Sequence, residues 1–211
     1  MSDIYYTVAS DGESKVTEKM SRFLGFAHHV CDETEAREYI KLYQNEYHDS
    51  RHVCWVYALG PKGDVWQLND NGEPSGTAGK PMLGQIRSLG LTDVVVVAVR
   101  YFGGIKLGTP GLIAAYRETA RQALEDAGTR EMYETERIEV VFPYMCADGV
   151  MKIVKGEGLE VVEREFDNVC RLLLEVRASR AEELRRRLAG VEGAEARCPG
   201  QEGMQDVAGG A

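Results

Sequence analysis

The spacing of hydrophobic residues along the chain predicts where its strands and helices lie. Residues 94–100 are apolar except for Arg100, as expected for a strand that is buried on both faces. Ala36, Ile40 and Tyr43 recur at helical spacing and predict a helix over 33–46. Shorter apolar runs between turn formers predict strands at 4–8 and 15–17 around a turn at 11–12, at 23–28, and in a hairpin of 53–59 with 64–68. Helical patterns follow at 77–89 and from 110 to the residue before Gly128.

The second half of the chain shows a different alternation. Strand patterns at 137–142, 159–164, 168–177 and 194–198 enclose helical patterns at 147–155 and 180–188. This order, β-α-β-β-α-β, is the ferredoxin-like motif. We therefore expect an α+β protein with a first domain at 1–130, a second at 131–200 and a flexible polar, glycine-rich tail at 201–211.

Small polar side chains mark the predicted helix starts. Asp32 and Ser179 each have a Glu three residues later, which is the capping-box pattern, and Thr109 is followed by a proline that suits a first helical position. Asp32, Thr109 and Ser179 are therefore expected to cap helices with their side chains, and Thr77 is a further expected cap if the loop over 70–81 is a rigid turn.

Composition and charge narrow the class of protein. The 211 residues are 44% hydrophobic, which is enough for two small cores, and no apolar run approaches the ~20 residues of a membrane helix. The start of the chain lacks the pattern of a signal peptide, so a cytoplasmic protein with no membrane contact is expected. Five scattered cysteines predict neither disulfides nor a zinc site. The net charge of −9 opposes nucleic-acid binding by the whole surface, yet residues 77–121 hold six basic and two acidic side chains, which predicts a local basic patch.

The glycine-rich loop after the apolar strand is the first candidate site. Gly103, Gly104 and Gly108 precede a predicted helix whose first amides have no partner, and Arg100 and Lys106 lie beside them, which favours an anion site. The alternative is that the glycines only satisfy backbone angles while Lys106 is solvated. The loop matches neither a P-loop nor a dinucleotide fingerprint, so no cofactor is predicted.

The loop over 70–81 is the second candidate surface. Asp70, Glu73 and Lys80 offer acid and amine groups for a partner, with Thr77 among the hydroxyls. The alternative is a rigid turn in which Thr77 caps the following helix.

Histidines and aromatic residues give weaker signals. His52 and Cys54 share one strand face, but a Cys in this apolar run favours a core role, so no catalytic residue is assigned and His52 is expected to hydrogen-bond near Glu73. His28 and His29 point to opposite faces, which opposes a metal site. Tyr101 and Phe102 could form a base-stacking platform unless one of them is core. Arg117 and Arg121 would extend the patch along one helix face unless that face is merely solvated.

Three long motifs carry a resemblance to a known family. Arg51-His-Val-Cys-Trp55, the run 70–81 and the run 100–108 resemble the Impact family of translation regulators and its bacterial relatives of two-domain type. Asn71, Val53 and Pro110 depart from residues usual in the family. The resemblance implies a first domain like domain 2 of ribosomal protein S5 and a second like an elongation-factor module. It also implies that eukaryotic members restrain the general-control kinase pathway of translation initiation.

Two functions remain open from the sequence. The first is a non-enzymatic module that contacts RNA, a ribosome or a translation-linked protein through the basic glycine-loop face. The second is an enzyme or binding protein for a small phosphorylated ligand, with Glu73 or Asp70 as acid or base. The candidate binding residues are Arg100, Tyr101, Phe102, Gly103, Gly104, Lys106, Gly108, Thr109, Arg117, Arg121, Lys80, Asp70, Glu73, Thr77 and His52. The sequence gives no oligomeric state.

Overall fold

The computed structural model describes residues 3–199 and divides into two compact units. The N-terminal unit is Ile4–Met132, and the C-terminal unit comprises residue 3 together with the chain from Tyr133 onward. The expected tail at 201–211 lies outside the described residues. Among residues 3–199, no helix is both long enough and apolar enough to cross a membrane.

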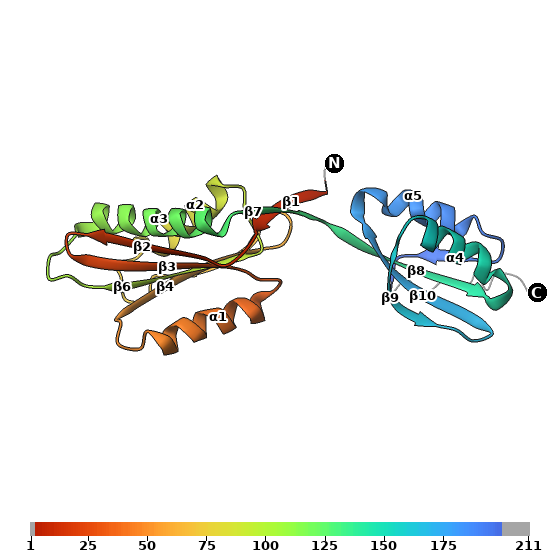
Figure 1. The fold of residues 1–211 in the computed structure, drawn as a ribbon, viewed down its shortest axis with the longest axis horizontal. Helices are drawn as coiled ribbons and strands as arrows, with labels where there is room; N and C mark the ends of the chain where they lie inside the picture. The colour runs from red at the N-terminus through yellow and green to blue at the C-terminus, as the bar shows by residue number, and fades with distance from the viewer. Residues whose placement is uncertain (1–2, 200–211) are drawn as a thin grey trace, which may run out of the picture. The chain divides into compact units, whose positions relative to one another are not determined.

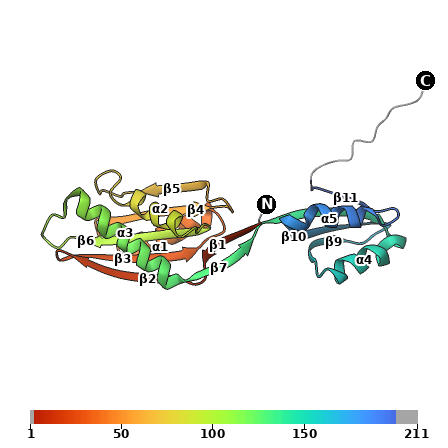
Figure 2. The same cartoon turned by 90° about the horizontal axis from the view of Figure 1, so that it is seen from above.

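The N-terminal unit is built on a five-stranded antiparallel sheet with helices on both faces. The strand order is β2-β3-β6-β4-β5, which Figure 2 shows from β5 at one edge to β2 at the other. Helices α2 and α3 cover one face, and α1 covers the other (Figure 1). The strands are β2 (Gly12–Glu18), β3 (Ser21–His29), β4 (His52–Leu59), β5 (Val65–Asn69) and β6 (Val94–Tyr101). The helices are α1 (Glu33–Glu46), α2 (Gly79–Ser88) and α3 (Gly108–Ala127).

Strand β6 lies at the centre because its side chains are apolar on both faces. Val94, Val96 and Ala98 pack under α2 and α3, whereas the alternate residues Val95, Val97 and Val99 pack under α1. The prediction of a strand buried on both faces is confirmed. The predicted hairpin of β4 with β5 is also confirmed, and Asp32 caps α1 by accepting a hydrogen bond from the Glu35 amide at 2.9 Å.

The first strand, β1 (Ile4–Val8), does not join this sheet. It pairs with β7 (Thr129–Tyr133) in a separate two-stranded sheet, and β7 was not predicted as a strand, because the sequence indicated only a domain boundary between residues 130 and 131. Gly12 was predicted to form part of a turn but instead begins β2, where a Cβ would lie 2.2 Å from the Ala123 carbonyl oxygen. The missing side chain therefore allows β2 to approach α3 closely.

The C-terminal unit has the predicted order β-α-β-β-α-β. Its antiparallel sheet has the order β11-β8-β10-β9, with an apolar core between the sheet and the two helices. The elements are β8 (Thr135–Pro143), the short 3₁₀ helix η1 (Tyr144–Cys146), α4 (Ala147–Gly156), β9 (Glu160–Glu165), β10 (Val169–Arg177), α5 (Ala178–Ala189) and β11 (Glu195–Arg197). The protein is therefore of mixed α+β class.

The prediction that Ser179 caps α5 is wrong. The helix begins two residues earlier than predicted, at Ala178, with Arg177 at the cap position and no side-chain cap bond. The Ser179 amide instead donates to the carboxylate of Asp3 at 3.2 Å, and Arg177 donates to the same carboxylate at 2.9 Å. These bonds hold the pKa of Asp3 well below its usual range. An acid from the far end of the sequence thus takes the capping role.

Candidate functional site

The loop before α2 is organised by the carboxylate of Asp70. Its Oδ1 accepts from the amides of Ala78 and Gly79 at 3.0 and 2.8 Å, and its Oδ2 accepts from the Gly76 amide at 2.6 Å. Thr77, expected to cap the helix, is buried and donates its hydroxyl to the Pro74 carbonyl at 2.7 Å. Asp70 therefore satisfies the amides of the cap residue Ala78 and of Gly79, the first residue of α2, and these two amides are not open to an anion.

A buried ion pair lies behind this loop. Arg100 Nη1 donates to Glu73 Oε1 at 2.7 Å, and the Tyr116 hydroxyl donates to the same oxygen at 2.9 Å. Arg100 is only 6% exposed, so the expectation that it presents its charge beside the glycine loop is wrong. A guanidinium at this depth needs a carboxylate partner, because an unpaired buried charge is costly. Glu73 and Arg100 neutralise each other inside the fold.

His52 and Cys54 do not form a nucleophile and base. The Cys54 thiol donates to the Asp70 carbonyl at 3.0 Å, and burial raises its pKa to about 12. His52 Nδ1 lies 3.1 Å from the Asn71 carbonyl oxygen, so within residues 3–199 its hydrogen bond is made to the backbone of the loop that carries Glu73 and not to Glu73 itself. The thiolate that a nucleophile requires is disfavoured here.

The glycine loop owes its composition to close packing and backbone conformation. A Cβ on Gly103 would lie 2.0 Å from the carbonyl carbon of Met20, in the β2–β3 turn. Gly104 and Gly108 have φ angles of +90° and +71°, which favour glycine. Helix α3 begins at Gly108 after Leu107, with no side-chain cap, so the prediction that Thr109 is the N-cap is wrong. The structure thus supports the backbone explanation of these glycines.

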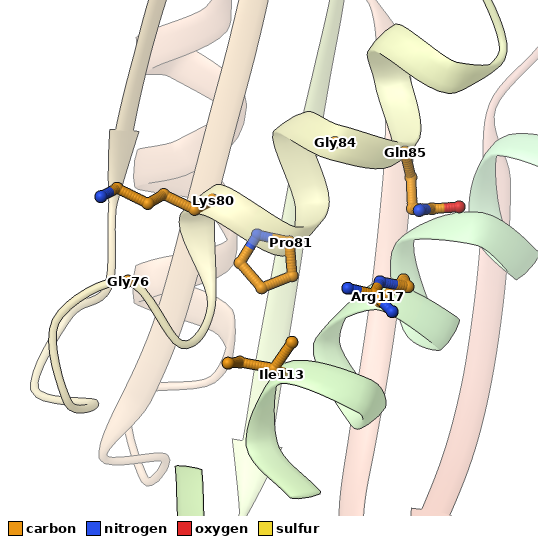
Figure 3. A pocket seen from close by; sticks show the side chains of 7 residues that line it. All are labelled: Gly76, Lys80, Pro81, Gly84, Gln85, Ile113 and Arg117. Carbon is orange, nitrogen blue, oxygen red and sulfur yellow. The ribbon is translucent and has the colours of Figure 1, made fainter. Parts of the chain in front are cut away.

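A groove of about 560 Å³ lies between α2 and α3, and two basic side chains are among the residues that line it. Lys80 comes from α2 and Arg117 from α3, on opposite sides of Pro81 and Ile113 (Figure 3). Both are exposed, and neither has a carboxylate partner within residues 3–199. Gly76, Gly84 and Gln85 complete the lining. Lys106 of the glycine loop is likewise exposed and lacks an ion pair in the described part of the chain.

The basic surface extends along α2 rather than along α3. Arg121 is bound by Glu118 at 2.5 Å and by Glu125 at 2.6 Å, so the prediction that it extends the patch is wrong. In contrast, residues 74–92 contain no acidic side chain, and Arg87 of α2 lies over the Trp66 ring. Arg87 and Lys62 line a second hollow of about 310 Å³. The acid-free stretch was a signal in the sequence that could have located this surface.

A further pocket of about 330 Å³ lies where β4 begins and β6 ends. It is lined by Asp49, Ser50, Arg51, His52, Tyr101 and Phe102. Tyr101 is half-buried and donates its hydroxyl to Asp49 at 2.7 Å, whereas Phe102 is 56% exposed. The loop that begins at Asp70 connects the two regions: a Cβ on Gly72 would lie 3.4 Å from His52 Nδ1, and Gly76 lines the groove.

Apart from the loop residues Gly103, Gly104, Gly108 and Thr109, whose conformation is described above, the predicted site residues fall into three groups. Lys80, Arg117 and Lys106 offer free charge, and His52, Tyr101 and Phe102 line the second pocket. Asp70, Glu73, Thr77, Arg100 and Arg121 are held in bonds within the fold. In the described part of the chain, no group of three or more His, Cys, Asp or Glu side chains is placed to hold a metal ion.

Comparison with known proteins identifies relatives by sequence. The Impact N-terminal domain model matches residues 19–124. The IMPACT family member YvyE of Bacillus subtilis is 40% identical over 127 residues, covering 60% of this chain and 58% of that protein. The IMPACT family member YigZ of Escherichia coli is 31% identical over 173 residues, covering 81% of this chain and 85% of that protein. The match thus spans less than two thirds of YvyE and most of YigZ.

Solved structures give a similar result. A crystal structure described as that of a hypothetical protein has a TM-score of 0.77 and 26% identity, covering 96% of this chain and all of that one. The two-domain translational regulator Yih1 is 27% identical and covers 58% of this chain and 47% of its own, with a TM-score of 0.35. Only the first of these supports a comparison of folds.

Proposed function

Since this chain belongs to the IMPACT family, we propose that it is a non-enzymatic, translation-associated regulator that contacts RNA, free or in the ribosome, through the groove between α2 and α3. The Protein IMPACT homolog of Saccharomyces cerevisiae is a relative by sequence, with 30% identity over 116 residues, and the solved structure of Yih1, which is 27% identical to this chain, is described as that of a translational regulator. A role in translation also fits a cytoplasmic protein. A translation-linked protein partner is the alternative that the experiment below separates.

The observation that carries the proposal is the pair of free cations in the groove. Lys80 and Arg117 line a hollow whose other lining residues include no acidic side chain, in a chain whose net charge is −9. Charge of one sign gathered in a concave surface attracts the opposite charge even when the whole molecule repels it. Lys106, Arg87 and Lys62 add exposed positive charge beyond the groove itself. A polyanion such as RNA suits this arrangement.

The bonds of the candidate acid and base groups weaken the enzyme alternative. Asp70 accepts three backbone amides, and Glu73 is held by Arg100 and Tyr116, so both carboxylates are committed to the fold. A general acid or base must reach a substrate, which neither group does in this arrangement. A small phosphorylated ligand bound in the groove remains the second candidate, because a hollow of about 560 Å³ is of ligand size.

We also propose the two fold likenesses implied by the family. The observed strand order β11-β8-β10-β9, with both helices packed on one face, supports a ferredoxin-like C-terminal unit. The N-terminal unit, with its central β6 and helices on both faces, is the candidate for the likeness to domain 2 of ribosomal protein S5. Elongation factors are built from modules of these kinds, which agrees with a role at the ribosome.

Co-sedimentation of the full chain with ribosomes and with free RNA tests the function. Lys80→Glu, Arg117→Glu and Lys106→Glu are expected to reduce binding at low salt, because each replaces a positive charge by a negative one. Lys41→Glu is the matched control, since Lys41 is exposed on α1 on the opposite face of the sheet. Binding that is equal for all four variants and the wild type would contradict the proposed face. Ribosome binding without any RNA binding would favour a protein partner instead.

A further inference from the structure

The pocket where β4 begins and β6 ends presents an aromatic ring that the fold does not cover. Phe102 is 56% exposed, and the Arg100 guanidinium packs against its ring, with the guanidinium carbon 5.6 Å from the ring centroid. A large apolar ring left open in a pocket of about 330 Å³ favours a planar ligand that stacks on it. The cation beneath the ring is itself buried and paired with Glu73, so the platform is rigid.

His52 gives the same pocket a hydrogen-bond acceptor. Its Nδ1 lies 3.1 Å from the Asn71 carbonyl, and a carbonyl only accepts, so Nδ1 carries the proton in the neutral ring. Nε2 is then a lone-pair acceptor, and it has no partner among residues 3–199. Arg51 adds an exposed cation to the pocket wall. These three groups suit the parts of a nucleotide: the Phe102 ring can stack on the base, His52 Nε2 can accept from the amino group of the base, and Arg51 can bind the phosphate.

The pocket and the groove between α2 and α3 are linked by one short loop. Gly72 packs against the His52 ring, and four residues later Gly76 lines the groove beside Lys80. Both glycines have positive φ angles, +82° and +79°, a backbone conformation that residues with a side chain rarely adopt. The loop therefore has the Phe102 pocket near Gly72 and the cations of the groove near Gly76.

We propose that the Phe102 pocket takes one unpaired nucleobase, which stacks on Phe102 and donates its exocyclic amino group to His52 Nε2, so that the protein selects single-stranded RNA. This inference rests on the proposed RNA-binding function. A duplex cannot fill the pocket, because its bases are stacked on one another and their amino groups are paired. Stacking of one base on an aromatic side chain contributes about 1–3 kcal/mol, which corresponds to roughly 5- to 150-fold in affinity.

Photo-crosslinking tests the inference with the full chain. The probe is a short single-stranded oligocytidylate that carries one 5-iodocytidine, which retains the amino group and crosslinks to aromatic rings that stack on it. We expect the crosslink on the peptide that contains Phe102, tighter binding of the single strand than of a duplex, and a roughly 5- to 150-fold loss of single-strand affinity in Phe102→Ala. Phe102→Trp is expected to retain the binding, and Phe166→Ala, an exposed ring of the C-terminal unit, is the matched control.

The outcomes separate this inference from the function on which it rests. RNA binding that depends on Lys80 and Arg117, but is unchanged in Phe102→Ala and equal for single strand and duplex, overturns the base pocket and leaves the groove in place. Absence of RNA binding in the wild type at low salt overturns both.

Discussion

The buried pair of Glu73 and Arg100 gives a sharp test of the structural account. Glu73 Oε1 receives both Arg100 Nη1 and the Tyr116 hydroxyl, and the side chains of Glu73 and Arg100 are 3% and 7% exposed. Glu73→Ala leaves the guanidinium buried without a carboxylate, beside an Nε that already lacks a partner in the described structure. Breaking a buried pair from one side costs about 3–5 kcal/mol. Since domain stabilities are about 5–15 kcal/mol, this variant loses a large part of the total.

Urea unfolding followed by tryptophan fluorescence measures this loss. Both tryptophans of the chain, Trp55 and Trp66, lie in the N-terminal unit, so the signal reports the unit that contains the pair. Glu125→Ala is the control, because it breaks an exposed ion pair with Arg121 that solvent screens.

A double variant separates the charge from the packing. Glu73→Leu combined with Arg100→Met removes both charges, so it is expected to be more stable than Glu73→Ala. If Glu73→Ala unfolds at the same urea concentration as Glu125→Ala, the pair contributes little and the reasoning is refuted.

Three further predictions follow from other contacts. Gly103→Ala is expected to lower the melting temperature by several degrees, because its Cβ would clash with the β2–β3 turn, whereas Gly84→Ala meets open space in α2 and should raise it slightly; calorimetry compares the two. Asp70→Ala is expected to lose about 1–3 kcal/mol in urea unfolding, since three backbone amides lose their acceptor. Burial raises the pKa of Cys54 to about 12, so only the unfolded chain ionises this thiol as pH rises past about 8.5. Between pH 8.5 and 10 the wild type should therefore lose up to about 1.4 kcal/mol per pH unit relative to Cys54→Ala, and a parallel dependence of both proteins would contradict the burial.

The spacing of apolar residues predicted most of the helices and strands, because the buried residues of one element are close together in the sequence. Strand β6 is apolar on both faces, and the capping pattern of Asp32 and Glu35 marks the start of α1. The strand β7 was missed because its residues are mostly exposed, and its pairing with β1 joins residues more than 120 positions apart. Pairing at that distance leaves no local pattern.

Helix caps were predicted less well for the same reason. The expected local caps Thr77 and Ser179 are displaced by carboxylates from elsewhere in the chain, those of Asp70 and Asp3. Thr109 is not a cap because α3 begins two residues earlier than predicted, at Gly108, which places Thr109 inside the helix. A capping rule that reads only neighbouring residues cannot find such partners.

The sequence predicted where the basic side chains of the candidate site lie, but not which of them are neutralised by acidic side chains. The sequence placed Arg100 at the exposed end of a strand, whereas Glu73, 27 residues away, binds it inside the fold. No pattern in the neighbouring sequence predicts an ion pair between residues that far apart. The pairing of Arg121 could have been predicted from the sequence, because Glu118 and Glu125 lie three and four residues from it on one helix. Lys80 and Arg117 keep their charge free within residues 3–199 because no acidic side chain lies three or four residues from either of them in the sequence.

The salt dependence of single-stranded RNA binding tests the central claim most directly. Affinity for a labelled oligonucleotide is measured across a range of salt for the wild type, for Lys80→Glu with Arg117→Glu, and for the control Lys41→Glu. Each phosphate contact contributes about 0.7 to the slope of log affinity against log salt, so loss of two contacts should reduce the slope by about 1.4 in the double variant, with the control parallel to the wild type. Equal slopes and affinities for all three proteins would contradict the assignment of the groove as the RNA-binding surface.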